Sequence, residues 1–229
     1  ERHDFDYNRV TDGLKLMLWG FFKKMVIADK AAIFVDVVYN NVHNYQGVSL
    51  WVATILFAFQ IYCDFSGYSD IAIGSAQVLG IKLMDNFNRP YFSKSISEFW
   101  KRWHISLSTW FKDYLYISLG GNRVSKLRWY LNIAIVFLVS GLWHGADWKF
   151  VIWGGLHGFY QLMGIWTMGF RERFFKGLGL AWPFARKLIQ VSTTFILVSF
   201  AWIFFRAENI SDAFYVARNL FSGSITREA

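Results

Sequence analysis

Long apolar stretches leave this chain few structures that it can adopt. Three of them are about twenty residues long, at 129–148, 150–168 and 188–205. An α-helix rises about 1.5 Å per residue, so roughly 20 apolar residues cross the ~30 Å hydrocarbon core of a bilayer. The three stretches therefore predict membrane-spanning helices, and we expect an all-α, multi-pass transmembrane protein.

Two further apolar regions are interrupted by polar residues. Residues 48–83 form the longer region, and the interrupting positions are Asp64, Ser66, Gly67, Ser69 and Asp70. We expect a span that continues into a broken or tilted helix. Residues 14–28 carry Lys23 and Lys24 near their middle. This pattern predicts a weaker span, or a helix that lies partly at the membrane interface.

The composition excludes a water-soluble globular domain and a disordered chain. Apolar residues make up 55% and aromatic residues 21%, while charged residues reach only 17%. Globular proteins have about 25% charged residues, and disordered chains have low hydrophobicity and few aromatic residues. The single cysteine, Cys63, excludes an internal disulfide and a cysteine-rich metal site.

The distribution of positive charge predicts how the chain is oriented in the membrane. The net charge is +8, and lysine and arginine residues gather in two loops, at 82–128 and 169–187. Cytoplasmic loops of membrane proteins carry an excess of these residues. We therefore expect both loops in the cytoplasm and the segments 40–47 and 145–149 outside. Because topology explains where the cations lie, they do not indicate a nucleic-acid partner.

The first basic loop contains a predicted helix of its own, near residues 96–117. Ser95 and Glu98 have the spacing of a capping box, in which Ser95 begins the helix and Glu98 returns a hydrogen bond to the Ser95 amide. Apolar residues then recur every three or four positions and predict one stripe along the helix: Phe99, Trp103, Leu107, Trp110 and Tyr114. We expect an interfacial or re-entrant helix; a membrane-surface helix without chemistry is the alternative.

His144 is the strongest candidate for acid–base chemistry. It is fifteen residues into the stretch that begins at 129, on the outer side of the predicted membrane midplane. Ionisable groups at membrane depth cost free energy and are candidates for function. Gly141 and Gly145 leave the backbone bare on either side, so we expect a substrate to approach closely. An imidazole suits a general base for an alcohol; a packing histidine is the alternative.

His104 lies on the predicted interfacial helix. Trp100 and Ser108 are four residues to either side of it, so a continuous helix places all three on one face. Cations surround this face, which we expect to accept an anionic carrier group from the cytoplasm: Lys101, Arg102 and Lys112. The alternative is that tryptophans and cations only anchor the helix at the interface.

The remaining candidate histidine, His157, follows two glycines in the stretch 150–168 and has the weakest support of the three. The histidines stand 40 and 13 residues apart, and the sequence has no H-x-x-x-H or H-E-x-x-H pair. Metal sites built on helices use such close spacings. We therefore expect no metal site.

Four ordered runs of this sequence resemble the membrane-bound O-acyltransferase (MBOAT) family. They are FQIYCDFSGYSD at 59–70, NFNRPY at 86–91, FWKRWHISLS at 99–108 and GLWHG at 141–145. The sequence is most similar to the bacterial branch, which contains the alginate O-acetylation membrane proteins and the D-alanyl transfer protein of teichoic acids. Residues 13–30 are also similar to the alginate members, so the resemblance covers nearly the whole chain.

The resemblance implies one MBOAT-like transmembrane domain over residues 1–229, truncated at both ends, in the inner membrane of a bacterial cell. It also implies two signature histidines, His104 and His144, of which the later is essential for catalysis. The implied enzyme is an O-acyltransferase without a bound cofactor. Its donor is a cytoplasmic thioester, either acetyl-CoA or an acyl carrier protein. Its acceptor is an extracytoplasmic polysaccharide such as alginate, or a partner acyltransferase.

Within that reaction we expect His144 to be the base and Asn86, Asn88 and Arg89 to hold the donor. His104 near the cytoplasm and His144 toward the outer face predict that the donor enters from inside and the acceptor waits outside. Two other classes of protein stay open. One is a non-enzymatic scaffold of a surface-polysaccharide complex, and the other is a transporter or export channel.

Overall fold

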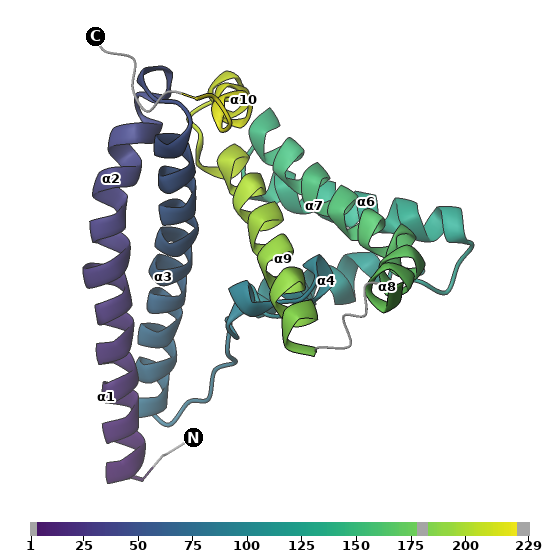
Figure 1. Ribbon diagram of the computed structural model, residues 1–229. Coiled ribbons are helices and arrows are strands. Elements are labelled where there is room, and N and C mark those ends of the chain that lie inside the picture. The colour runs from purple at the N-terminus through teal and green to yellow at the C-terminus, as the bar shows by residue number, and fades with distance from the viewer. Residues whose placement is uncertain (1–3, 178–182, 224–229) are drawn as a thin grey trace. The chain divides into compact units, whose positions relative to one another are not determined.

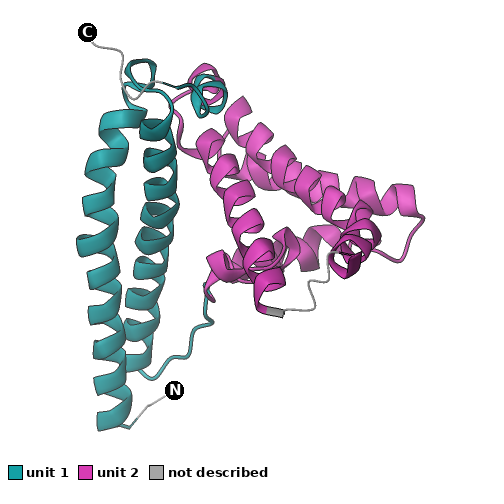
Figure 2. Cartoon of the chain, in the orientation of Figure 1, with its two compact units in different colours: residues 1–87, 215–229 teal, residues 88–214 magenta. Residues whose placement is uncertain are grey.

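The computed structural model describes residues 4–177 and 183–223, and within these ranges the regular structure is helical, without a strand. The chain divides into two compact units (Figure 2). Unit 1 is Glu1–Phe87 with Tyr215–Ala229, and unit 2 is Asn88–Phe214. Each unit is built around its own antiparallel pair of long helices. The predicted all-α fold is confirmed.

Unit 1 is a long helical hairpin. Its first arm is α1 (Tyr7–Phe21), a π-helical segment (Phe22–Ala28) and α2 (Asp29–Tyr39), which follow one another without a break. The second arm is α3 (Val48–Val78), and a short loop with one 3-10 turn (Val42–Asn44) joins the arms. Figure 1 shows the two arms side by side. The first arm is therefore longer than the predicted segment 14–28.

Two glycine pairs bring the arms of this hairpin into backbone contact. A Cβ atom at Gly20 would lie 2.6 Å from the carbonyl oxygen of Gly67, and one at Gly13 would lie 2.7 Å from that of Gly74. Small residues at such crossings let helices pack closely in membranes. The exposed side of the first arm carries many large apolar side chains, such as Leu18 and Ile33, which suits contact with lipid.

The polar residues of α3 do not break the helix, so the broken alternative predicted for 48–83 is wrong, and the tilted one stays a prediction. Lys23 Nζ lies 2.8 Å from the carboxylate of Asp70 and donates to Ser66 Oγ at 3.0 Å. Lys24 Nζ lies 2.6 Å from Asp64, and it also contacts Asp29. Because the facing arm supplies a cation for each acidic side chain of α3, the helix continues through them. Lys23 and Lys24 therefore form ion pairs within the hairpin.

Unit 2 begins with short elements and continues with long helices. The short elements are a 3-10 turn (Pro90–Phe92), α4 (Ile96–Trp100), α5 (Ile105–Trp110) and a π-helical segment (Phe111–Tyr116). The long helices are α6 (Lys126–His144), α7 (Trp148–Trp166) and α9 (Pro183–Arg206), with α8 (Met168–Gly177) between the last two. Helix α10 (Ile210–Asn219) begins at the end of this unit. Figure 1 shows α6 and α7 as an antiparallel pair.

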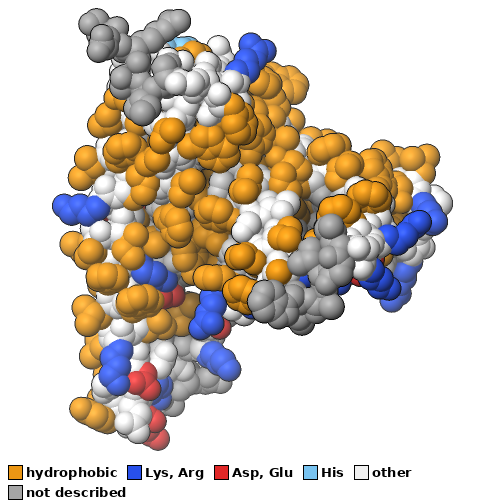
Figure 3. Space-filling view, in the orientation of Figure 1, with side chains coloured by type: hydrophobic (Ala, Val, Ile, Leu, Met, Phe, Trp, Pro, Cys, Tyr) orange, Lys and Arg blue, Asp and Glu red, His pale blue; other side chains and the backbone are white. Residues whose placement is uncertain are grey.

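Among the described residues, three helices are long and apolar enough to cross a membrane: Val48–Val78, Lys126–His144 and Phe184–Arg206. They correspond to three of the predicted spans. The predicted span 150–168 is a helix of nearly the expected bounds, α7, but it is not among these three. Hydrophobic side chains cover most of the visible surface, with lysine and arginine gathered in patches (Figure 3). This distribution suits a protein surrounded by lipid.

The predicted helix at 96–117 is present as helical structure but is not continuous. Ser95 begins α4 and accepts a hydrogen bond from the Glu98 amide at 3.1 Å, as predicted, whereas Glu98 returns its bond to the amide of Lys94. The chain then turns at 101–104 before α5 begins. The prediction that apolar side chains form one stripe along this segment is therefore wrong. The turn separates the residues before it from those after it, so that Trp103 is buried and Trp110 is exposed.

Candidate functional site

His144 is the last residue of α6 and lies half-buried among aromatic rings. The ring centroids of Trp143 and Trp153 are each 4.9 Å from its imidazole, and that of Phe205 is 5.3 Å away. Within the described ranges its ring nitrogens make no hydrogen bond. An imidazole in this state can accept a proton from an incoming group.

His104 occupies a strained backbone position. Its φ of 43° and ψ of 58° place it in the left-handed region, which costs a residue other than glycine roughly 1–2 kcal/mol. This conformation ends the turn after α4, and the His104 carbonyl accepts a hydrogen bond from the Ser108 amide at 2.9 Å as α5 begins. Because the helix is interrupted here, the predicted shared face of Trp100, His104 and Ser108 does not exist. Strain of this kind concentrates at functional sites.

The structure brings the two signature histidines together. The His104 ring lies 6.5 Å from that of Trp143, and the Trp143 ring in turn lies 4.9 Å from the His144 imidazole. The sequence also predicts that the two histidines stand at different depths in the membrane, and this stays a prediction. Burial lowers the pKa of His104 to about 4, so its imidazole is neutral at pH 7.

The two glycines that flank His144 pack against α7 and do not open the backbone to a substrate. A Cβ atom at Gly141 would lie 2.3 Å from the carbonyl oxygen of Phe150, and one at Gly145 would lie 2.5 Å from the Phe150 ring. The predicted bare approach is therefore wrong, because the neighbouring helix already fills that space. Their role is to let α6 and α7 cross closely beside His144.

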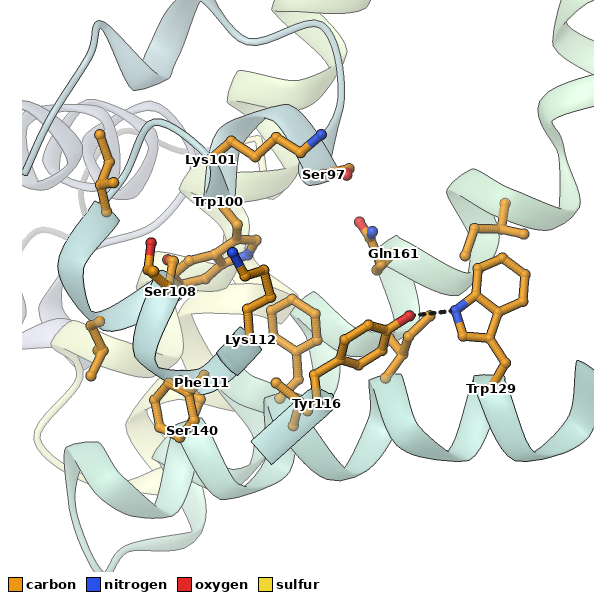
Figure 4. Close-up of a pocket in the computed structure, with 17 residues that line it drawn as sticks. Ser97, Trp100, Lys101, Ser108, Phe111, Lys112, Tyr116, Trp129, Ser140 and Gln161 are labelled. Carbon is orange, nitrogen blue, oxygen red and sulfur yellow. Dashed lines mark hydrogen bonds between the residues drawn. The ribbon is translucent and has the colours of Figure 1, made fainter. Parts of the chain in front are cut away.

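A cavity of about 490 Å³ opens beside the turn at 101–104, between the segment 96–116 and helices α6 and α7 (Figure 4). Its floor is apolar, with Phe137 and Ile133 from α6 and Ile165 from α7. Polar side chains also reach it: Ser97, Lys101, Ser108, Thr109, Lys112, Tyr116, Ser140 and Gln161. Within the described ranges the Lys101 ammonium has no acidic partner, whereas that of Lys112 lies 3.1 Å from Asp113. Neither His104 nor His144 is among the residues that line this cavity.

The π-helical segment Phe111–Tyr116 supplies one wall of the cavity. The Tyr116 hydroxyl accepts a hydrogen bond of 2.9 Å from the indole of Trp129, which fixes that end of the wall (Figure 4). The turn after it is held by Asn132, whose side-chain amide donates to the carbonyls of Leu119 and Gly121 at 3.0 Å. π-helical turns are rare and occur frequently at functional sites. Sequence periodicity does not reveal them.

The three residues predicted to hold the donor fall in different surroundings. Asn86 belongs to unit 1, whereas Asn88 and Arg89 belong to unit 2. The backbone amide of Asn88 donates to the Arg102 carbonyl at 2.9 Å. Arg89 has a left-handed φ of 46° directly before the 3-10 turn. Asn88 and Arg89 do not line the cavity described above. Their assignment to the donor stays a prediction.

His157, which the sequence supports least, is fully buried and bonded to a cavity residue. Its Nδ1 accepts a hydrogen bond of 3.3 Å from the indole of Trp100. The partners are 57 residues apart, and a contact over that separation leaves no signal in local periodicity. Within the described ranges, no group of three or more histidine, cysteine or acidic residues could hold a metal ion.

Comparison with known proteins agrees with the sequence motifs. The profile of the MBOAT, membrane-bound O-acyltransferase family matches residues 13–205, across both units. The chain is 41% identical over 216 residues to the peptidoglycan O-acetyltransferase of Helicobacter pylori, covering 94% of this chain and 40% of that protein. It is 42% identical over 216 residues to the probable alginate O-acetylase AlgI of Pseudomonas aeruginosa, covering 94% and 39%.

A more distant relative is the teichoic acid D-alanyltransferase of Streptococcus thermophilus, 33% identical over 162 residues, or 66% of this chain and 39% of that protein. The chain thus spans about two fifths of the length of the curated relatives it matches. The predicted resemblance is confirmed. This chain belongs to the membrane-bound O-acyltransferase family.

Proposed function

We propose that the protein containing this chain is an O-acyltransferase of the bacterial inner membrane. It moves an acyl group, in the first instance an acetyl group, from a cytoplasmic thioester to hydroxyl groups of an extracytoplasmic polysaccharide such as alginate. Family membership and the names of the acetyl-transferring relatives support the class of reaction. The observation that carries it is His144, which has no hydrogen-bond partner in the described chain and whose neighbour Trp143 has its ring 6.5 Å from that of the strained His104.

In this reaction His144 is the general base. An acceptor hydroxyl oxygen bonds to the carbonyl carbon of the thioester, and its proton passes to the His144 imidazole. The carbon–sulfur bond then breaks, and the proton moves on to the leaving thiolate. Such a base typically contributes ~10²–10⁴-fold to the rate. His104 is the second catalytic residue in this proposal, held toward the reacting groups by its left-handed backbone.

The cavity of unit 2 is the proposed place for the donor's arm. Acetyl-CoA and acyl carrier proteins both present their thioester on a long, flexible phosphopantetheine arm. The apolar floor suits the body of such an arm, while Lys101 and Lys112 offer charge to its phosphate. In this proposal Asn86, Asn88 and Arg89 contact the carrier beyond the cavity. The acyl group leaves on a polysaccharide hydroxyl or on a partner acyltransferase.

The test is ester formation on polysaccharide by the intact protein in its own membrane. His144→Gln keeps the bulk and hydrogen-bonding ends of the side chain but removes the base, so we expect a loss of ~10²–10⁴-fold at normal abundance. His43→Gln is the matched control: the same exchange at a histidine of unit 1 that contacts Tyr215, expected to keep full activity. Normal ester content in His144→Gln membranes would reject the catalytic role and favour a scaffold.

A further inference from the structure

His157 is a polar side chain at the centre of an aromatic cluster. It is 0% exposed. The rings of Phe99 and Phe137 lie nearly parallel to its imidazole, at interplanar angles of 7° and 20°. The rings of Trp100 and Trp153 meet it edge-on, at 5.0 and 5.1 Å. An apolar ring would pack in this setting without the cost of burying a polar group, so packing alone does not explain a histidine here.

The hydrogen bond to Trp100 fixes the tautomer of this histidine. A neutral imidazole has one acceptor and one donor nitrogen. Because Nδ1 accepts from the indole N–H of Trp100, the proton of His157 must be on Nε2. Nε2 is buried and has no hydrogen-bond partner in the described chain. The protein thus leaves one polar atom of this residue unsatisfied while its other nitrogen accepts from Trp100.

Trp100 and Trp153, whose rings both contact His157, differ in their hydrogen bonding. The indole N–H of Trp153 is also buried, and it has no hydrogen-bond partner in the described ranges. Trp153 does not line the cavity, whereas Trp100 does. The aromatic cluster therefore leaves the indole N–H of Trp153 unsatisfied, although it satisfies that of Trp100 at the cavity wall. Because a buried indole N–H can stay unsatisfied here, the bond to Trp100 does more than satisfy a polar group. We take its role to be the orientation of Trp100.

Trp100 joins the end of α4 to the turn that carries His104, so its orientation affects both. It is the last residue of α4, directly before the turn that ends at the strained His104. The bond from its indole ties this end of α4 to α7. A left-handed backbone at His104 persists only if its surroundings hold it. The Trp100–His157 bond is a fixed contact at the start of that turn.

We propose that His157 is a positioning residue: through its bond to Trp100 it holds the end of α4, and with it the cavity wall and the His104 turn. This inference rests on the proposed acyl transfer for its kinetic consequence, but the positional consequence stands on the structure alone. His157 does not touch the reacting groups in this proposal. It acts through Trp100.

The kinetic test compares three variants of the intact protein in membranes. His157→Phe keeps the ring and loses the acceptor, and we expect the turnover per molecule to fall by up to about 100-fold at normal abundance, since small misplacements cost that much. His157→Asn places an amide oxygen near the position of Nδ1 and should restore most of the turnover. Trp100→Phe removes the donor and should match His157→Phe, with no added loss in the double variant. Phe159→Leu, an exposed neighbour on α7, is the control.

A second readout does not depend on acyl transfer. In a Cys63→Ser background, the Ser97→Cys variant, changed on α4, is allowed to react with a maleimide. His157→Phe should speed this labelling, because α4 is released from α7, while His157→Asn should not. Unchanged labelling in His157→Phe, or equal turnover in the Phe and wild-type proteins, overturns the positioning role. If the wild type forms no ester but labelling rises as expected, the proposed function fails and the positioning role stands.

Discussion

Lys23 in unit 1 and His157 in unit 2 are both buried, ionisable side chains, yet their surroundings differ. Lys23 lies against a carboxylate and a hydroxyl of the opposite helix, Asp70 and Ser66. His157 is surrounded by aromatic rings and makes one hydrogen bond, from Trp100. The hairpin of unit 1 accommodates a charge by pairing it. Unit 2 keeps an uncharged imidazole and leaves one of its nitrogens unpaired.

The difference separates a buried polar group that the protein satisfies fully from one that it leaves partly unsatisfied. A paired ion is already satisfied by the protein, so it has little left to offer a substrate. The imidazole of His144, like Nε2 of His157, has no hydrogen-bond partner in the described chain, and His144 also lies half-buried at a helix end. Intramembrane charge alone would have drawn attention to Lys23 and Asp70. The lack of a hydrogen-bond partner instead draws attention to His144 and His157.

The largest expected effect comes from removing the charge partner of Lys23. Asp70→Leu leaves a buried ammonium without its carboxylate, which should lower the free energy of unfolding by about 3–5 kcal/mol. The double variant Lys23→Met/Asp70→Leu removes both charges and should recover most of that loss. Denaturant titration of the intact protein in detergent measures both. Asp12→Leu, which breaks a solvent-exposed pair with Lys15 on α1, is the control and should cost under about 1 kcal/mol.

If the double variant were as unstable as Asp70→Leu, the ion pair would hold something besides the charge of Lys23. The hydrogen bond to Ser66 is then the next contact to examine. Equal stability of Asp70→Leu and the wild type would mean that water reaches Lys23, and unit 1 would no longer differ from unit 2 in how it satisfies a buried charge.

A smaller effect is expected from the glycine contact between the same two arms. Gly20→Ala places a methyl group 2.6 Å from the Gly67 carbonyl oxygen, so the backbones must separate at a cost of about 1–3 kcal/mol. Gly164→Ala is the matched exchange in α7 of unit 2, where no atom lies within 4 Å of the added carbon. It should be neutral or stabilise the helix by up to about 1 kcal/mol. A Gly20→Ala protein as stable as the wild type would contradict the close crossing.

The sequence predicts the long helices well because the length of an apolar run sets the length of a membrane helix. The prediction 129–148 became Lys126–His144, and 188–205 became Pro183–Arg206. The site is harder to predict, because its decisive features join distant residues. The left-handed backbone of His104 and the Trp100–His157 bond depend on packing between α4 and α7, and periodicity within 96–117 predicts a straight helix instead.

Motif resemblance and the cost of placing an imidazole in a membrane predict His144 and His104, and the structure adds that the His104 ring lies 6.5 Å from that of Trp143, the residue before His144. Sequence predictions are wrong where they treat a helix face as open. The sequence predicts that substrate approaches at Gly141, but α7 fills that space. Asp64 and Asp70 predict a break in a span, but the lysines of the other arm pair with them. In both cases the partner is in another part of the sequence.

The smallest expected effect compares two fully buried serines, one from each unit. Ser66 in α3 accepts a hydrogen bond from Lys23, whereas the Ser199 hydroxyl in α9 has no hydrogen-bond partner within the described ranges. Serine and alanine differ by one oxygen atom, so neither exchange leaves a large cavity. Ser66→Ala should lower the free energy of unfolding by about 1 kcal/mol, because Lys23 loses a partner. Ser199→Ala should be neutral or stabilise by a similar amount, because it removes a buried hydroxyl that is not satisfied.

Denaturant titrations of the two variants in one detergent give the difference directly. Equal losses would show that the Ser199 hydroxyl is bonded to water or lipid, and that it does not differ from Ser66 in how it is satisfied.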